Sequence, residues 1–527
     1  MKRFLVARNL YTNIIVIVIL ISLVIFSYSN TLTNFFLDDE YGFLITPFFS
    51  HHESISHFII HRPAEFIPNV FAYFFWACIA KVFGSSPIYH HFAMILLHIM
   101  ASYLLFVFVR GISGETLLGL CTALLFAVSY ISAETVARVM HMQYVLCAIF
   151  FLVSLLCITY RKSWYFMFFA LLSFILGLMC KEIILILPCV VLIYDYFFRN
   201  PLELSKRCKV YIILFSITIF YLIIKFSFPI RFGSMGSLWR GEVPYVIFFR
   251  EHGLLKGMYL YGIKLITIPL KHIIISVNRF VFGPYTSIIK SILVAVNCLP
   301  IFVYLGLNPR KFLSDKVFWF GLIWVIINAV PFIHLLDSID YNNGGLINTR
   351  YLYLSSMGFA LMLGRSLQQL IIERRRWLKR ISVTLFIAIL LISMIILYGN
   401  NSAYQYAAEI AREIPLQTMK KFPLPNGGKQ KYFFLCVKDE LYYAKGVHLF
   451  KNGGLDGAFL LAYNYTPDIY IVDTKEYNER LQKYNTVPDN LLPKIDLSKA
   501  TSEGYVLRWD KINRSVIEVN VEEENSY

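Results

Sequence analysis

The sequence has few charged residues for its length. Only 16% of its 527 residues are Asp, Glu, Lys or Arg, whereas 57% are hydrophobic and the mean hydropathy is +0.60. Typical soluble domains carry about 25% charged residues. This low content of charged residues excludes a water-soluble protein and predicts a membrane protein, whose solvent is partly lipid.

Several sequence signatures are also missing. The chain has no CxxC pair and most of its nine cysteines lie in apolar segments, which argues against a disulfide framework, structural zinc or redox chemistry. It has no GxxxxGK(S/T) loop, so ATP-driven transport has no support. His51, His52, His57 and His61 lack HExxH or comparable spacing, which gives a metal site built from them little weight.

Positive charge is in excess, with a formal net charge of +16. In membrane proteins, Lys and Arg gather in cytoplasmic loops beside anionic headgroups. No basic run extends beyond the loops that flank the apolar segments. We therefore expect membrane lipid as a partner and no nucleic acid.

Apolar stretches recur along the first 400 residues. They cover 10–29, 66–83, 88–109, 116–132, 140–160, 163–180, 183–198, 210–230, 253–270, 286–307, 317–333, 351–371 and 381–398. The first has about 20 residues, enough to span a bilayer, and no small-residue cleavage site follows it. We interpret it as a retained span rather than a signal peptide.

Length does not decide whether 66–83 and 253–270 cross the membrane, but loop charge does. If both lie along the outer surface, the basic residues that flank the spans all face the cytoplasm; if they cross, many face outward. These residues are Lys2, Arg3, Arg8, Arg110, Arg161, Lys162, Arg199, Lys206, Arg207, Lys209, Arg310, Lys311, Lys316 and the run 374–380. The positive-inside rule thus predicts about eleven spans, a cytoplasmic N-terminus and two surface helices on the outer face.

The character of the chain changes near residue 400. Charged residues become frequent, and turn signals occur at 426–428 and 452–454. Strands are predicted at 432–437, 458–463, 468–472, 505–509 and 515–521. We expect a membrane domain over 1–399 and a small α+β extracytoplasmic domain over 400–527.

Acidic residues in the first outer loop, 30–65, are the main candidates for chemistry. Asp38, Asp39 and Glu40 are adjacent, and their mutual repulsion favours a raised pKa in at least one of them. Such a carboxylate can take a proton from an acceptor hydroxyl or bind a divalent metal. The alternative is an ordinary acidic helix start, and the spacing alone leaves both interpretations open.

Other ionisable residues are expected at the same membrane surface. Glu134 lies in a short loop, Lys181 and Arg350 lie at span ends, Arg62 opens the first surface helix, and His141 follows the Glu134 loop. Ionisable groups near a bilayer are costly and often mark function, whereas capping and snorkelling are the structural alternatives.

The order of these motifs resembles a known family. After the acidic cluster come Arg62-Pro63, Tyr89-His90, Leu97-His98, Phe126-Ala127, Glu134-Thr135-Val136-Ala137, Cys180-Lys181-Glu182, Leu187-Pro188, Tyr194-Asp195 and the segment 350–358. Over roughly residues 10–370, this order resembles the GT-C superfamily of polyprenyl-phosphate-sugar-dependent glycosyltransferases. Within that superfamily it is most similar to the protein O-mannosyltransferase-like branch, which includes TPR-containing transmembrane O-mannosyltransferases.

The resemblance implies an all-α polytopic membrane fold and an inverting sugar transfer on the outer face. Asp39 would be the general base, with Asp38 as the nearest alternative, and Glu134 would complete the catalytic site. The donor phosphate would be bound by residues of three outer segments: Arg350, Tyr351, Lys181 and Arg62. Glu40 and His141 are candidates for binding the acceptor or a divalent metal, whose requirement stays open. The sequence departs from the family at Ser129-Tyr130 and His141-Met142, where His-Pro and Gly-Arg are usual.

The resemblance also implies a lipid-linked sugar as co-substrate, a protein, lipid or glycan as acceptor, and a multi-pass location in a prokaryotic plasma or inner membrane. Two alternatives stay open. A transporter or flippase of a lipid-linked sugar needs the same phosphate site but no base, and a non-catalytic scaffold would tolerate changes at Asp38 and Asp39.

Overall fold

The computed structural model describes most of the helical region and parts of the tail. The described residues are 2–37, 40, 69–84, 86–160, 163–200, 207–227, 286–331, 349–423, 431–436, 443–444, 447–449, 455, 458–459, 468–473, 504–510 and 513–519. Asp38, Asp39, Arg62 and the predicted surface segment 253–270 lie outside this set.

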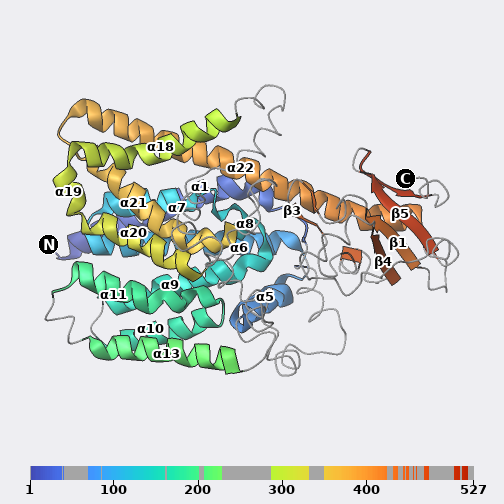
Figure 1. Ribbon diagram of the computed structural model, residues 1–527, viewed down its shortest axis with the longest axis horizontal. Helices are drawn as coiled ribbons and strands as arrows, with labels where there is room; N and C mark the ends of the chain where they lie inside the picture. Colours follow the sequence, from blue (N-terminus) through green and yellow to red (C-terminus); the bar gives the residue numbers. More distant parts are fainter. Residues whose placement is uncertain are drawn as a thin grey trace, which may run out of the picture.

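Long helices pack side by side into a bundle (Figure 1). They are α1 (Lys2–Tyr28), α6 (Pro87–Ser113), α7 (Thr116–Ala127), α9 (Met142–Tyr160), α10 (Trp164–Leu178), α11 (Leu187–Phe198), α13 (Cys208–Ser227), α18 (Thr286–Leu307), α20 (Lys316–Ala329), α21 (Tyr353–Ile371) and α22 (Arg376–Lys421). Short elements connect them: η1 (Ser29–Thr31), α8 (Ser132–Ala137), η2 (Val139–His141), η3 (Glu182–Ile186), α19 (Pro309–Leu313) and η7 (Thr349–Leu352).

The described helices have the character of membrane spans. Four of them are long and apolar enough to cross a bilayer: Leu10–Thr31, Pro87–Ser113, Val139–Thr159 and Arg376–Lys421. Helix α10 also turns aromatic rings outward, since Trp164 and Phe168 are 67% and 56% exposed. Water would not favour such a surface, whereas lipid and its interface do. The chain is therefore an integral membrane protein.

Glycines allow α21 to pack closely against α20 and α7. A Cβ at Gly358 would lie 2.9 Å from the carbonyl oxygen of Gly321 on α20, and a Cβ at Gly364 would lie 2.8 Å from Oγ1 of Thr122 on α7. Small residues allow helix backbones to approach this closely inside membranes. The contacts fix α21 and thereby η7, the turn that leads into it.

Helix α5 (Val70–Phe83) packs against α6 and α9. Its 14 residues extend for about 21 Å, the same length as α20. The backbone N–H of Phe71 donates to the carbonyl of Met179 at 3.1 Å, and Trp76 Nε1 donates to Nδ1 of His90 at 2.9 Å. Val82 on its other side is 71% exposed. That α5 lies along the outer membrane surface stays a prediction.

Helix α22 continues without a break through residue 400, where the sequence suggested a domain boundary, and carries a small sheet at its end (Figure 1). The sheet has the order β4-β1-β5-β6. Its strands are β1 (Lys431–Cys436), β4 (Asp468–Asp473), β5 (Gly504–Asp510) and β6 (Ser515–Glu518), and β2 (Tyr443–Ala444) pairs separately with β3 (Val447–His448). β1 is parallel to β4 and β5, and β6 is antiparallel to β5.

Four of the five predicted strands are confirmed, but the one at 458–463 is wrong in its described part. Ala458 and Phe459 are helical and buried. The Phe459 ring stacks on Tyr432 of β1, with 5.9 Å between ring centroids. Packing against the sheet has outweighed the β propensity of the aromatic run.

Candidate functional site

Four segments far apart in sequence meet at one end of the bundle: the chain at residue 40, α8 with η2, η3 and η7. Contacts join α8 to η7, α22 and α6, and join η3 to α9 and α10. In Figure 1, α8 and α5 lie at the end that faces the sheet, whereas the N-terminus, α19 and the start of α22 lie at the opposite end. The described candidates Glu40, Glu134, His141, Lys181 and Arg350 belong to these meeting segments.

Glu134 on α8 binds the η7 turn. Its Oε1 lies 2.5 Å from Nη1 of Arg350, and its Oε2 accepts the backbone N–H of Arg350 at 2.9 Å and Oγ1–H of Thr349 at 3.1 Å. The Glu134 side chain is only 2% exposed, and that of Arg350 is 20% exposed. The carboxylate is thus fully engaged in holding η7 against α8.

Glu40 is held in a similar way by backbone groups. Its Oε2 accepts the N–H of Leu37 at 2.7 Å, and its Oε1 accepts the N–H of Met140 at 3.3 Å. Nε of Arg138 lies 3.9 Å from Oε1, and the Glu40 side chain is 1% exposed. These bonds anchor the chain on both sides of Asp38 and Asp39 to the turn that follows α8.

Lys181 contrasts with both carboxylates. Its Nζ lies 3.7 Å from Oε2 of Glu182 and 5.3 Å from the ring centroid of Tyr144. Neither contact is a hydrogen bond, because N–H to O bonds are about 2.7–3.2 Å long. The side chain is only 16% exposed. Among the described residues, this ammonium therefore has no hydrogen-bond acceptor.

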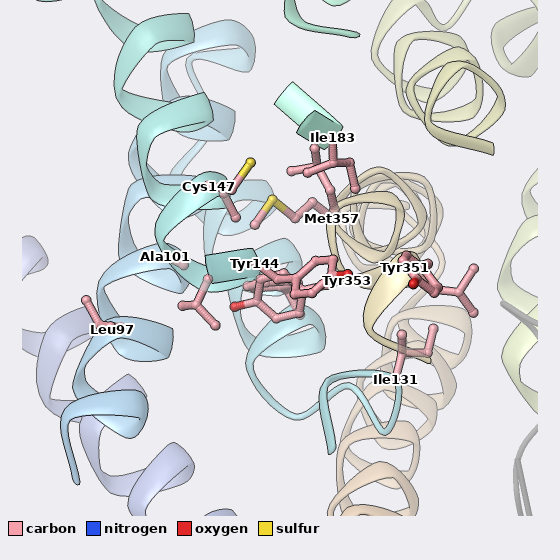
Figure 2. Packing of buried hydrophobic residues seen from close by; sticks show 14 of the residues in the cluster. Leu97, Ala101, Ile131, Tyr144, Cys147, Ile183, Tyr351, Tyr353 and Met357 are labelled. Atoms are coloured by element: carbon pink, nitrogen blue, oxygen red, sulfur yellow. The ribbon is translucent and has the colours of Figure 1, made fainter. Parts of the chain in front are cut away.

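Aromatic rings contact the side chains of both Lys181 and Arg350. The guanidinium of Arg350 lies 4.9 Å from the ring centroid of Tyr351, and the rings of Tyr351 and Tyr144 meet edge to face at 5.9 Å. Figure 2 shows Tyr144 and Tyr351 within the buried apolar cluster that includes Met357. Apolar walls strengthen electrostatic attraction to a bound anion because they exclude water.

His141 lies beside this cluster but faces Glu134 through its backbone. Its Nδ1 lies 3.1 Å from the Glu134 carbonyl oxygen. A carbonyl only accepts, so Nδ1 carries the proton in the neutral ring. His141 is 3% exposed. Among the described residues, no group of three or more His, Cys, Asp or Glu side chains is placed to bind a metal ion.

Two buried residues near the site were not among the candidates. Tyr404 on α22 is 2% exposed and interacts electrostatically with Glu40, Glu134, Arg138 and Arg350. Nothing local in the sequence signals this position, because α22 reaches the site only beyond its apolar part.

His98 on α6 is fully buried and supports α21. Its Nε2 lies 3.0 Å from the carbonyl of Ala127, which requires a proton on Nε2. Nδ1 is therefore an acceptor, and the hydroxyl of Tyr353 donates to it at 2.7 Å. Tyr353 directly follows η7, so this bond helps to fix the position of Arg350.

Comparisons with known proteins add little to this description. No protein-family model matches the chain, and no curated protein matches it. The crystal structure of ArnT from Cupriavidus metallidurans bound to undecaprenyl phosphate aligns with 94% of this chain and 93% of its own, at 11% identity and a TM-score of 0.44. Its apo state gives the same coverage and identity and a TM-score of 0.45.

A crystal structure of the Archaeoglobus fulgidus oligosaccharyltransferase in complex with Zn and sulfate aligns with 83% of this chain and 62% of its own, at 12% identity and a TM-score of 0.41. With identities and TM-scores this low, the case for a function depends on the residues of the chain itself.

Proposed function

We propose that the chain is a membrane glycosyltransferase that moves a sugar from a polyprenyl-phosphate donor to an acceptor on the extracytoplasmic face. The observation that carries the proposal is the ammonium of Lys181, which is largely buried and has no hydrogen-bond acceptor among the described residues. An ammonium has three N–H donors, and burying it without acceptors is unfavourable. A phosphate oxygen supplies both the acceptor and the opposite charge.

The surroundings of Lys181 suit a lipid phosphate in particular. Tyr144 and Tyr351 provide an apolar wall, and Arg350 contributes further N–H donors beside them. Arg350 binds Glu134 through one guanidinium nitrogen and also interacts with the hydroxyls of Tyr144 and Tyr351. A guanidinium has five N–H donors, so others remain for a phosphate. In this proposal Lys181 and Arg350 bind the donor phosphate, and Glu134 positions Arg350.

The base comes from the first outer loop. Glu40 already accepts two backbone hydrogen bonds, which leaves Asp39, or Asp38 as the alternative, for proton transfer. The carboxylate takes the proton of the acceptor hydroxyl, and the hydroxyl oxygen forms a bond to the anomeric carbon. The bond from that carbon to the phosphate oxygen breaks, the polyprenyl phosphate leaves with the electron pair, and the configuration inverts. The preference for Asp39 rests on the resemblance to GT-C enzymes.

The same proposal includes the membrane orientation, with about eleven spans, a cytoplasmic N-terminus and the site end outside. Single cysteines at Ile112 and Ser205, in a chain without its native cysteines, test it. We expect both to resist an impermeant thiol reagent applied from outside intact cells, and labelling of either one contradicts this orientation.

Sugar transfer in isolated membranes tests the reaction. We expect Asp39→Asn to lower transfer from a polyprenyl-phosphate sugar by about 10²-fold or more, the usual size of a general-base contribution. Asp510→Asn, in the sheet far along the chain, is the matched control and should transfer normally. If Asp38→Asn and Asp39→Asn both transfer at the normal rate, the base assignment fails and the transporter and scaffold alternatives gain support.

A further inference from the structure

The side chain of Tyr144 contacts residues from both segments that carry the cations of the phosphate site. Nζ of Lys181 lies 5.3 Å from the Tyr144 ring centroid, and the ring of Tyr351 meets the Tyr144 ring edge to face at 5.9 Å. The Tyr144 hydroxyl interacts with the guanidinium of Arg350. Lys181 directly precedes η3 and Arg350 lies in η7, so one buried side chain on α9 contacts both cations.

The first turn of α9 fixes the position of Tyr144. The side chain is buried, and the ring of His141 meets its ring edge to face at 5.9 Å. Residues three apart in a helix lie on the same face, so Cys147 points to the same side of α9 as Tyr144. Sγ of Cys147 donates to the carbonyl of Lys181 at 3.4 Å (Figure 2). Helix α9 therefore contacts Lys181 twice, at its backbone through Cys147 and at its ammonium through Tyr144.

An aromatic ring can hold an ammonium that also has to bind an anion. The face of a tyrosine ring attracts a cation within about 6 Å of its centroid, and this attraction adds no negative charge that would repel a phosphate. The Glu182 carboxylate attracts Nζ of Lys181 as well, at 3.7 Å, and the Tyr144 ring adds a second, uncharged contact. A side chain that is already held loses less conformational freedom on binding. This freedom is worth about two- to tenfold in affinity for each side chain that is ordered.

We propose that Tyr144 is a positioning residue of the donor-phosphate site, whose ring holds the Lys181 ammonium where it binds the phosphate. The inference rests on the proposed function, because it assumes that Lys181 binds a lipid phosphate. The role belongs to the ring more than to the hydroxyl. Arg350, which the hydroxyl contacts, is already held by Glu134 through its guanidinium and its backbone N–H, whereas Nζ of Lys181 has no hydrogen-bond acceptor among the described residues.

Binding of a short polyprenyl phosphate tests this role. The probe is farnesyl phosphate, with farnesol for comparison, added to the purified full-length protein in detergent at neutral pH. Tyr144→Leu, which removes the ring, should weaken farnesyl phosphate binding about two- to tenfold. Tyr144→Phe, which keeps the ring, should stay within about twofold of the unchanged protein. Farnesol has no phosphate, so its affinity should change in neither variant. Tyr196→Leu on α11, where the side chain is 73% exposed, is the matched control with no expected change.

A double-mutant cycle separates positioning of Lys181 from general packing. Lys181→Met should weaken farnesyl phosphate binding by about tenfold or more, since it removes a charge-assisted hydrogen bond to the phosphate. In that background Tyr144→Leu should bring no further loss, because no ammonium is left for the ring to hold. A purely structural role of Tyr144 would give the same loss in both backgrounds. Thermal unfolding of each variant shows whether it is folded, and Tyr144→Met replaces Tyr144→Leu if the latter unfolds.

Two kinds of negative result have different meanings. If Lys181→Met binds farnesyl phosphate as well as the unchanged protein, the proposed phosphate site is wrong. If Lys181→Met weakens binding but a folded Tyr144→Leu or Tyr144→Met variant binds as tightly as the unchanged protein, the phosphate site stands and the positioning role of Tyr144 is overturned. The same conclusion follows if Tyr144→Leu loses equal affinity in both backgrounds or for farnesol, or if Tyr144→Phe loses as much as Tyr144→Leu.

Discussion

Glu134 binds Arg350 twice, through its guanidinium at 2.5 Å and through its backbone N–H at 2.9 Å. The two residues are 216 positions apart in sequence. One carboxylate therefore sets both the side-chain direction of Arg350 and the path of the η7 backbone. Because it is buried, its loss would leave a cation without compensation.

Glu134→Gln should destabilise the protein. Breaking a buried ion pair from one side costs about 3–5 kcal/mol, and the partial exposure of Arg350 places this change toward the lower end. We expect a lower thermal unfolding temperature in detergent together with weaker farnesyl phosphate binding. The matched change Glu413→Gln removes a carboxylate that is 37% exposed beside Arg514, and it should cost less than about 1 kcal/mol. Equal effects of the two substitutions would contradict the proposed importance of the Glu134 contact.

Tyr353→Phe should loosen the start of α21. The substitution leaves Nδ1 of the fully buried His98 without its donor, which costs about 1–3 kcal/mol. We expect a lower unfolding temperature and a modest rise in the Kd for farnesyl phosphate, because Arg350 precedes Tyr353 by one short turn. His98→Phe combined with Tyr353→Phe removes both polar partners and should recover part of the stability. A single substitution as stable as the unchanged protein would show that the bond contributes nothing.

The pH dependence of phosphate binding follows from the pKa of Lys181. Burial alone lowers the pKa of this lysine, but the Glu182 carboxylate, Tyr351 and Tyr73 together outweigh burial, so its pKa lies above the ordinary 10.5. The charged form, and the stability that it contributes, are fully present below pH 10.5 and are lost only as the pH rises through the raised pKa.

We therefore expect the affinity of the unchanged protein for farnesyl phosphate to stay constant from about pH 8 to about pH 10. Glu182→Gln removes the carboxylate that raises the pKa of Lys181 most strongly against the effect of burial. The pKa of Lys181 should therefore fall, and affinity should decline at a lower pH than in the unchanged protein. Titration of the Kd in both proteins measures this. An identical alkaline limb in the two proteins would mean that Glu182 does not act on Lys181.

Gly358→Ala should disturb the packing of α20 against α21. The added Cβ would lie 2.9 Å from a backbone oxygen and 3.1 Å from the Trp324 ring, neither of which moves easily. Overpacking of this kind costs about 1–3 kcal/mol. Gly306→Ala on α18 is the control, since nothing lies within 4 Å of its added Cβ, and it should be neutral or stabilise the helix by up to about 1 kcal/mol. Gly358→Ala should therefore lower the unfolding temperature, whereas Gly306→Ala should leave it unchanged or raise it.

Composition and periodicity determined the class of this protein. A chain with 57% hydrophobic residues has to bury apolar surface in lipid, and within the described residues its apolar runs coincide closely with helices. The strands β1, β4, β5 and β6 also follow from local alternation and turn residues. Such features are predictable because helix and strand formation depend on neighbouring residues along the chain.

Tertiary structure alone decided how the charges of the site are distributed. The resemblance assigned Glu134 to the catalytic site and Lys181 and Arg350 to the donor phosphate. In the fold, buried Glu134 binds Arg350 and the η7 turn, and the Lys181 ammonium has no hydrogen bond among the described residues. Tyr404 enters the site from a helix that begins at the other end of the bundle. These relationships depend on the positions of helices that are distant in sequence, and the packing that sets those positions leaves no local signal.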